Sequence, residues 1–321
     1  MMSVAATTGL DPKAKRHFGF VAFIFASSLL SYKTLSALVA YSFHNASSSH
    51  IVLIPLVSFS LLYAERQKIF VNTETGVISG IGLALGGAVL YWLVDRNFFP
   101  QGGNWPLSLG TLSVVLVWTG GFLFCYGFTA LRAAAFPLLF LLLMVPLPDV
   151  VLDTIVHALQ VGSTEVAYLV FQAVGTPVIR QGFVLSVPGV TIEVAQECSS
   201  IRSSMALFIT CLLAVHLYLR TRWKMVLFVL LSLPVSLIKN GIRIATLTLL
   251  SIHVNPGFLT GRLHREGGFA FFAVALLILC PVFLWLEESE QPRKTLHSAV
   301  LEKPGAETIT SINTADSSGG V

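Results

Sequence analysis

The sequence predicts an all-α, polytopic membrane protein with about eight transmembrane helices. Of its 321 residues, 55% are hydrophobic and only 11% are charged, whereas a soluble domain has about 25% charged residues. Apolar stretches near the length that crosses a hydrocarbon core recur along the whole chain. The basic residues stand in short clusters between these stretches, as topology signals do. The net charge of +4 is therefore no argument for nucleic acid, and the partners that we expect are membrane lipid and no nucleic acid.

Eight apolar runs, each bounded by polar or basic residues, are predicted to cross the membrane. They are residues 17–41, 51–64, 76–94, 107–131, 133–147, 198–219, 225–252 and 264–286. The first run is too long for a signal-peptide core, so we expect a retained span. Residues 1–16 and 287–321 are polar, and we expect a disordered cytoplasmic N-terminus and a disordered cytoplasmic tail. Residues 17–286 are expected to form a single integral membrane domain.

One region interrupts this pattern before the sixth run. Residues 149–175 carry apolar side chains at helical spacing but also several charged ones, which predicts an amphipathic helix lying in the outer interface. Residues 176–194 then change period, because prolines and glycines separate short β-branched pieces. We expect a short extended or hairpin element there.

The basic clusters predict which ends of the spans share a side of the membrane. Cytoplasmic positions are expected for residues 13–16, 66–68, 132, 220–224 and 293–294. The region 149–197 holds a single basic residue, Arg180, and is expected outside. Eight spans satisfy all these assignments with both termini inside, whereas an additional span at 149–175 would break the parity.

This topology brings three chemically capable residues to one depth. The helix from Cys198 to Arg220 is about 33 Å long, and that from Lys224 to Arg243 about 28 Å. Cys198 and Arg243 therefore return to a similar level near the outer surface. His264 opens the next predicted helix after a short outer loop and enters at the same level. The sequence thus predicts a shared level, while the directions of the side chains stay open.

A thiol, an imidazole and a guanidinium at one level fit nucleophilic catalysis. Cys198 would be the nucleophile as a thiolate, which needs a base or a nearby positive charge. His264 would act as base and then as acid for the leaving amine. Arg243, which stays protonated, would stabilise the thiolate or an oxyanion. Each residue alone also fits an inert role, and only their joint placement favours catalysis.

Five further residues are expected to support this site or to bind substrate. Glu193 and Glu197 would orient an arginine or a substrate, although Arg202 would equally form a structural ion pair with either of them. Ser199 would help to cap the helix that follows Cys198. Asn240 lies one turn before Arg243 in the same apolar run, where polar groups are usually functional.

The other cysteines, Cys125, Cys211 and Cys280, fall inside apolar runs and are expected to behave as small hydrophobes. The chain has no C-x-x-C pattern, so the sequence indicates neither a metal site nor a cofactor.

Three sequence blocks carry these candidates. They are IEVAQECSSIR at 192–202, NGIRI at 240–244, and His264 followed by Gly267, Gly268 and Phe271. Together with MVPLP at 144–148 and RQG at 180–182, they resemble the signature of the exosortase/archaeosortase family of bacterial and archaeal integral membrane proteins. The resemblance covers roughly residues 130–285. One departure is Ser199-Ser200, where many members have a glycine soon after the cysteine.

The resemblance implies a membrane-embedded cysteine protease or transpeptidase of sortase type. Its partners would be exported proteins, cut at C-terminal sorting signals that combine a Pro-Glu-Pro-like motif with a transmembrane helix. The reaction would pass through a thioester acyl-enzyme on Cys198, with Arg243 and His264 completing the site. The enzyme would lie in the bacterial cytoplasmic (inner) membrane as a multi-pass protein, with its site facing the periplasm.

Two other functions remain open from the sequence. One is a non-enzymatic transporter or a scaffold for exopolysaccharide export, in which Arg243 and Glu193 bind an anionic solute. The other is a membrane acyltransferase that uses His264 without a covalent intermediate.

Overall fold

The computed structural model describes residues 12–71, 73–100, 102–195, 201–258 and 268–290. The first half of the chain contains the helical elements α1 (Pro12–Leu30), α2 (Tyr32–His44), η1 (Ala46–Ser48), α3 (Leu53–Ala64), α4 (Arg66–Ile69), α5 (Val77–Asp95), α6 (Trp105–Ala133), α7 (Ala135–Phe140) and η2 (Leu141–Met144). The second half contains α8 (Asp149–Ala173), β1 (Ile179–Gln181), β2 (Val184–Val187), β3 (Val190–Glu193), α9 (Ile201–Tyr218), α10 (Arg222–His253), η4 (Pro256–Phe258) and α12 (Gly268–Glu288).

The protein is a mostly helical polytopic membrane protein with one small sheet. Within the described residues, five helices, α5, α6, α9, α10 and α12, are long and apolar enough to cross a membrane. The number rises to seven if α1 with α2, and α7–η2 with α8, each count as one bent span. The predicted second span, α3, is apolar but only 12 residues long. The polytopic class is confirmed, and the described residues contain five to seven candidate spans where about eight were expected.

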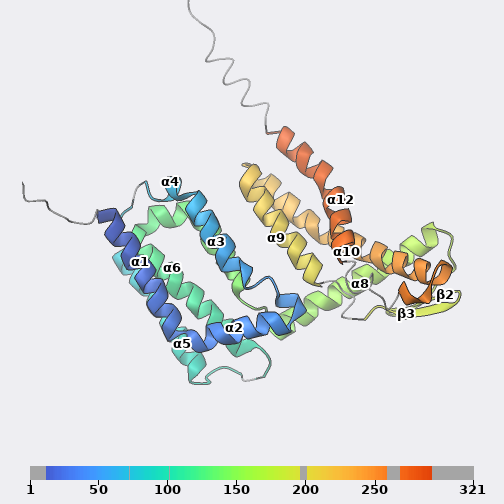
Figure 1. Ribbon diagram of the computed structural model, residues 1–321, viewed down its shortest axis with the longest axis horizontal. Coiled ribbons are helices and arrows are strands. Elements are labelled where there is room, and N and C mark those ends of the chain that lie inside the picture. Colours follow the sequence, from blue (N-terminus) through green and yellow to red (C-terminus); the bar gives the residue numbers. More distant parts are fainter. Residues whose placement is uncertain (1–11, 72, 101, 196–200, 259–267, 291–321) are drawn as a thin grey trace, which may run out of the picture.

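The long helices form two groups along the long axis of the molecule (Figure 1), and side chains of α9 pack against the core of the first group. The first contains α1, α3, α5 and α6, and the second contains α9, α10 and α12. Helices α2 and α8 run across the lower end of this view, where they connect the long helices instead of continuing them (Figure 1). Helix α10 packs against α8, α9 and α12, so it is the central element of the second group.

Two predicted spans end at sharp bends. The first breaks at Ser31, where α1 and α2 meet at 78°. Just before the break, the hydroxyls of Ser27 and Ser28 donate to the carbonyl of Ile24, a back-bond that weakens and bends a helix. At the second bend, η2 and α8 meet at 91°, because Pro146 and Pro148 end one helix before the next begins.

A helix at 149–175 is confirmed, since α8 spans Asp149–Ala173, and its position in the outer interface stays a prediction. Its first residue is held to the start of α6. Asp149 accepts a hydrogen bond from the backbone N–H of Asn104 at 2.8 Å, and Asn104 accepts one from the backbone N–H of Asp149 at 2.9 Å. The Asn104 amide also donates to the carbonyl of Leu147. This reciprocal pair fixes the corner at which the chain turns into α8.

The basic clusters of the described chain gather at the opposite end from this corner. Arg16 at the start of α1 donates to Thr73, which lies in the connection between α4 and α5. Glu65 at the end of α3 bonds His216 in the last turn of α9 at 2.7 Å. The carboxylate of Glu290, after α12, accepts from the backbone of Arg220. These contacts agree with the predicted sharing of one side by the clusters.

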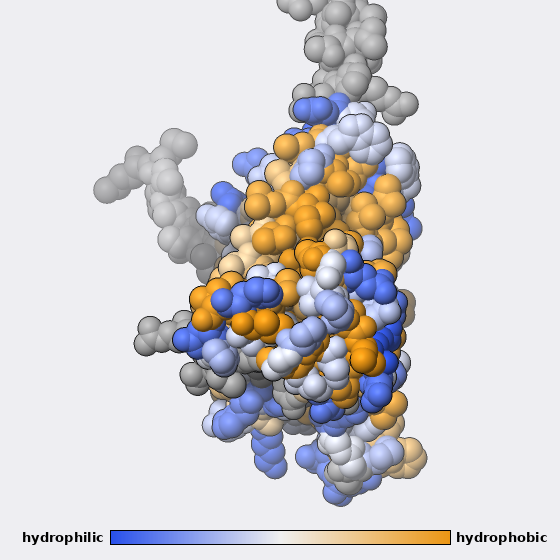
Figure 2. All heavy atoms as spheres, turned by 90° about the vertical axis from the view of Figure 1, so that its right-hand side faces the viewer, coloured by the Kyte–Doolittle hydropathy of each residue, from blue (hydrophilic) through white to orange (hydrophobic). Residues whose placement is uncertain are grey.

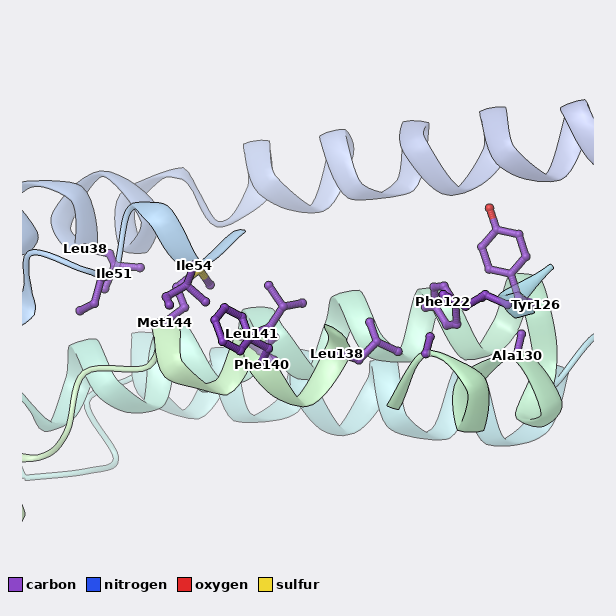
Figure 3. Packing of buried hydrophobic residues seen from close by; sticks show 13 residues of the cluster. Leu38, Ile51, Ile54, Phe122, Tyr126, Ala130, Leu138, Phe140, Leu141 and Met144 are labelled. Carbon is purple, nitrogen blue, oxygen red and sulfur yellow. The ribbon is translucent and has the colours of Figure 1, made fainter. Parts of the chain in front are cut away.

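The core of the first group is a continuous layer of apolar side chains (Figure 3). Phe122 and Tyr126 of α6 lie at one end of it, with ring centroids 4.9 Å apart. Met144 of η2 lies toward the other end, near Ile51 and Leu38 (Figure 3). The outer surface of the second group is apolar as well: Figure 2 shows hydrophobic residues over the upper part of the face that carries α12, with polar residues below and at the rim.

The predicted extended element at 176–194 is a three-stranded antiparallel sheet in the order β1-β2-β3. Leu185, Val187 and Val194 bury one face of it against Phe171 of α8 and Ala245 of α10. This alternation of buried and exposed side chains is what an amphipathic strand predicts. The sheet therefore sits on the two helices that pass the candidate site.

Candidate functional site

The structure describes some of the predicted site residues and not others. Arg243, Asn240, Arg202 and Glu193 lie in described elements. Cys198, Glu197 and Ser199 fall in 196–200, and His264 falls in 259–267, which lie outside the described residues. The convergence of the thiol, imidazole and guanidinium therefore stays a prediction.

A polar turn in the middle of α10 is the centre of what the structure does describe. Lys239 is 1% exposed, and its ammonium donates to the hydroxyl of Ser203 in the first turn of α9. Asn240 is also buried, and its amide donates to the hydroxyl of Ser163 on α8 at 2.9 Å. Consecutive residues of α10 thus bind two different helices. Such polar contacts between helices are typical of membrane interiors.

Close packing brings α8 against this turn. A Cβ atom added to Gly241 would lie 2.4 Å from the Val166 side chain and 2.9 Å from the backbone nitrogen of Ala167. Only glycine allows the two helices to approach this far, as small residues do in membrane proteins generally. The polar turn is therefore held in a fixed position relative to α8.

Arg243 lies one turn after Lys239 on α10 and is half-buried. Residues four apart share one helix face, and the guanidinium is close enough to the Lys239 ammonium for the two charges to interact. Two cations thus stand on one face of α10 in a mainly apolar segment. A pair of this kind favours a negative charge nearby, because a buried cation is costly without one.

The two described supporting residues lie at the surface. Glu193, on β3, and Arg202, at the second position of α9, are both exposed. Neither takes part in an ion pair within the described chain. The expected orientation of Arg243, Arg202 or a substrate by Glu193 therefore stays a prediction. The ion pair found beside the sheet joins Arg180 to Glu165 of α8.

The described residues on either side of the cysteine are anchored. The carbonyl of Val194, just after β3, accepts a hydrogen bond from the buried amide of Gln160 on α8. On the other side, Ser203 in α9 is bound to Lys239. The chain therefore enters and leaves the segment 196–200 at positions fixed by α8 and α10.

An apolar cavity of about 470 Å³ adjoins the first turns of α9. It lies between α8, α9, α10 and the connections around η1 and η2. Ile201, Met205 and Phe208 line it from one face of α9. Ser204 and Ser236 also reach it, and these two hydroxyls share a hydrogen bond. A volume of this size suits a small ligand or a few side chains.

His50 lines the same cavity from the connection before α3. Burial lowers the pKa of His50 from its ordinary value of 6.5, although hydrogen bonds with the backbone of Ser47 and Leu143 act in the opposite direction. The imidazole is therefore kept neutral near pH 7, which suits an apolar wall.

Sequence reasoning left four residues of this region out of the site. They are Lys239, Ser203, Ser163 and Gln160. Lys239 carried a signal, since a charge inside an apolar run is usually functional. The serines and the glutamine carried none, because their partners lie far away in sequence. Within the described residues, no group of three or more His, Cys, Asp or Glu side chains is placed to hold a metal ion.

Comparison with known proteins gave one match. A family model described as transmembrane exosortase matches residues 42–281, which include the polar turn of α10, the sheet and the cavity. No curated protein and no solved structure matches the chain.

Proposed function

Because the chain belongs to the transmembrane exosortase family, we propose that it is a membrane-embedded cysteine protease or transpeptidase. Its substrates are exported proteins that end in a sorting signal, with a Pro-Glu-Pro-like motif and a transmembrane helix. The enzyme lies in the bacterial inner membrane, and its site faces the periplasm.

The proposed reaction uses the three predicted residues. The thiolate of Cys198 attacks the scissile carbonyl and forms a tetrahedral intermediate, whose oxyanion Arg243 stabilises. His264 gives a proton to the leaving amine as the C–N bond breaks. The resulting thioester on Cys198 is then opened by water or by an amine acceptor.

The hydrogen bond from Lys239 to Ser203 is the observation that supports this proposal most directly. Ser203 lies five residues after Cys198, and Lys239 lies four before Arg243. The contact therefore holds the turn before Arg243 beside the helix that follows the cysteine. A cation at this place favours a thiolate over a neutral thiol.

The apolar cavity beside α9 supports a peptide substrate with an apolar segment. Its lining residue Ile201 lies three positions after Cys198, so a substrate cut at the cysteine would have hydrophobic surface within reach. Burial of apolar side chains there would contribute about 25 cal/mol for each Å² removed from water.

The test is the processing of a tagged exported protein that carries a sorting signal, in membranes that contain Cys198→Ala. Unprocessed substrate should accumulate in this variant. The matched control is Cys280→Ala, because Cys280 is an exposed cysteine of α12 whose loss should leave processing unchanged. Normal processing by Cys198→Ala would end the proposal.

A second substitution of Cys198 and a trapping experiment separate the other two functions. A transporter or an export scaffold would keep its function in Cys198→Ser, whereas the proposed enzyme would lose it. An acyltransferase that uses His264 alone would form no covalent adduct on Cys198. A thioester trapped on this residue, detected by mass spectrometry of the intact protein, would therefore exclude it.

A further inference from the structure

Strand β3 has one edge that faces away from the sheet. The backbone N–H of Val194 donates to the carbonyl of Phe183 at 2.9 Å, so the N–H group of Val194 points toward the β2 side. Backbone groups alternate along an antiparallel pair, and Ile192 therefore also turns toward β2. Thr191 and Glu193 turn theirs outward. No hydrogen bond from elsewhere in the described chain reaches these outward N–H groups, whereas the outward carbonyl of Glu193 already accepts one from the N–H of Ala195 at 3.0 Å.

The two outward-turned residues have exposed side chains, on the face of β3 opposite the buried one. Val190 and Ile192 pack against the apolar cluster on α8 and α10, whereas the side chains of Thr191 and Glu193 are exposed. In Figure 1, β3 lies at the lower border of the sheet. An unpaired strand edge is a template for another extended chain, and here the buried face of the sheet keeps the template rigid.

The edge also points to a particular place in the chain. Glu193 is the last residue of β3, and Cys198 follows five residues later. Five residues of extended chain span at most about 18 Å. A peptide lying along β3 would therefore have its next residues within reach of the proposed nucleophile.

We propose that the substrate binds as a fourth strand, with an extended peptide segment beside the scissile bond paired to the outward edge of β3. The inference rests on the proposed function and adds to it the mode of recognition. The outward groups of β3 recur at every second residue, which matches an extended peptide backbone and matches neither a helix nor a lipid chain. Main-chain pairing also accepts different side chains, so one enzyme can take many exported proteins.

The first test leaves the enzyme intact. The probe is a set of fluorescent synthetic peptides with a Pro-Glu-Pro motif and flanking residues, each N-methylated at one non-proline position. Binding is measured to full-length Cys198→Ala enzyme in nanodiscs. Methylation should raise the Kd about five- to ten-fold at every second position and have little effect between them. A scan without this alternation overturns the proposal.

The second test alters the edge itself. Thr191→Pro removes one outward N–H and keeps the pairing with β2, since proline is tolerated on an edge strand. Thr191→Ala is the control, because the Thr191 hydroxyl also bonds Ser186 and its loss must be separated. The proline variant should bind the peptide at least about five-fold more weakly than the alanine variant. Equal affinities overturn the proposal.

A third variant serves as the control for loss of sheet stability. Ile192→Pro removes a hydrogen bond of the β2–β3 ladder and should lower the melting temperature, whereas Thr191→Pro should not. If Thr191→Pro changes the oligomeric state but leaves peptide affinity unchanged, the edge joins two copies of the chain, and the proposal is wrong.

These outcomes are distinct from failure of the proposed function. Peptide binding is measured without catalysis, so it does not depend on the role of Cys198. Normal processing by Cys198→Ala would reject the mechanism and leave the binding scan standing, and a flat scan with an inactive Cys198→Ala would reject only the strand pairing.

Discussion

The amide of Asn240 donates a hydrogen bond to the hydroxyl of Ser163 across 2.9 Å, and so joins α10 to α8 within one turn of Arg243. Both residues are buried. The neighbour of Asn240, Lys239, bonds α9 at the same height. The orientation of Arg243 is therefore set by contacts with two helices, and four predictions follow from these and related contacts.

The Asn240–Ser163 bond should carry a measurable coupling energy. Polar contacts between membrane helices contribute about 0.6 kcal/mol on average and up to about 1.7 kcal/mol. We expect Ser163→Ala and Asn240→Ala each to lower the free energy of unfolding, and the double variant to lose less than the sum. Unfolding of the four proteins in mixed micelles gives this double-mutant cycle. Strict additivity would mean that the bond does not hold the helices together.

Gly241 should not tolerate a larger residue. The Cβ of Gly241→Ala would press on Val166 and on the backbone of α8, and relief of such overpacking typically costs about 1–3 kcal/mol. Processing should fall as well, because α10 must move. The control is Gly82→Ala on α5, where nothing lies within 4 Å of the added Cβ; this variant should stay within about 0.5 kcal/mol of wild type. Both are compared by melting temperature and by processing rate.

The two buried lysines of α10 should separate function from stability. Lys239→Met removes the cation beside the proposed thiolate, and we expect at least a ten-fold loss in kcat/KM with the fold retained. Lys224 is also buried, in the first turn of α10, where it donates to Ser289 at 2.6 Å and to the Leu286 carbonyl. Lys224→Met should lower the melting temperature and leave kcat unchanged in the protein that remains folded. The reverse pattern would assign the lysines the opposite roles.

Glu290 should make stability depend on pH. Burial opposes its ionisation, but hydrogen bonds from Arg220 and Thr221 and the charge of Lys224 outweigh it, so the pKa of Glu290 lies below its ordinary value of 4.5. The folded state thus binds the proton less readily than the unfolded state. The stabilisation is complete above pH 4.5 and is lost as the pH falls through the folded pKa.

The measurement for Glu290 is thermal unfolding between pH 3 and pH 7. Glu290→Gln should flatten the curve at its acidic end, with a loss of about 1 kcal/mol at neutral pH. Glu288→Gln removes an exposed carboxylate of the same turn and should leave the wild-type profile. If both variants behave alike, the hydrogen bonds between Glu290 and the backbone of Arg220 and Thr221 contribute nothing to the free energy of unfolding.

Local sequence patterns predicted those elements of the fold that depend mainly on neighbouring residues. Apolar runs gave the long helices, amphipathic spacing gave α8, and prolines and glycines gave the small sheet. The break at Ser31 was not predicted, because the apolar composition continues across it and the back-bonding serines are a detail of one turn. The short second span, in contrast, was predicted at residues 51–64, and α3 spans Leu53–Ala64.

The sequence suggests which residues form the candidate site, but it could not supply the contacts that position them. Depth along a helix follows from residue count, so the level of Arg243 could be estimated. The hydrogen bonds of Lys239 with Ser203 and of Asn240 with Ser163 depend on the rotation of each helix about its own axis. This rotation cannot be derived from the sequence alone. Glu193 was expected to orient an arginine or a substrate, and this role stays a prediction.

The reciprocal bonds between Asn104 and Asp149 have a consequence for how the protein is made. The two residues are 45 positions apart, and both precede the sheet and all of the second helical group. A ribosome therefore releases the complete pair, with the core around Phe122 and Met144, before the helix that holds Arg243 exists. The first helical group can fold in the membrane during synthesis, and the later helices then pack against an already folded surface.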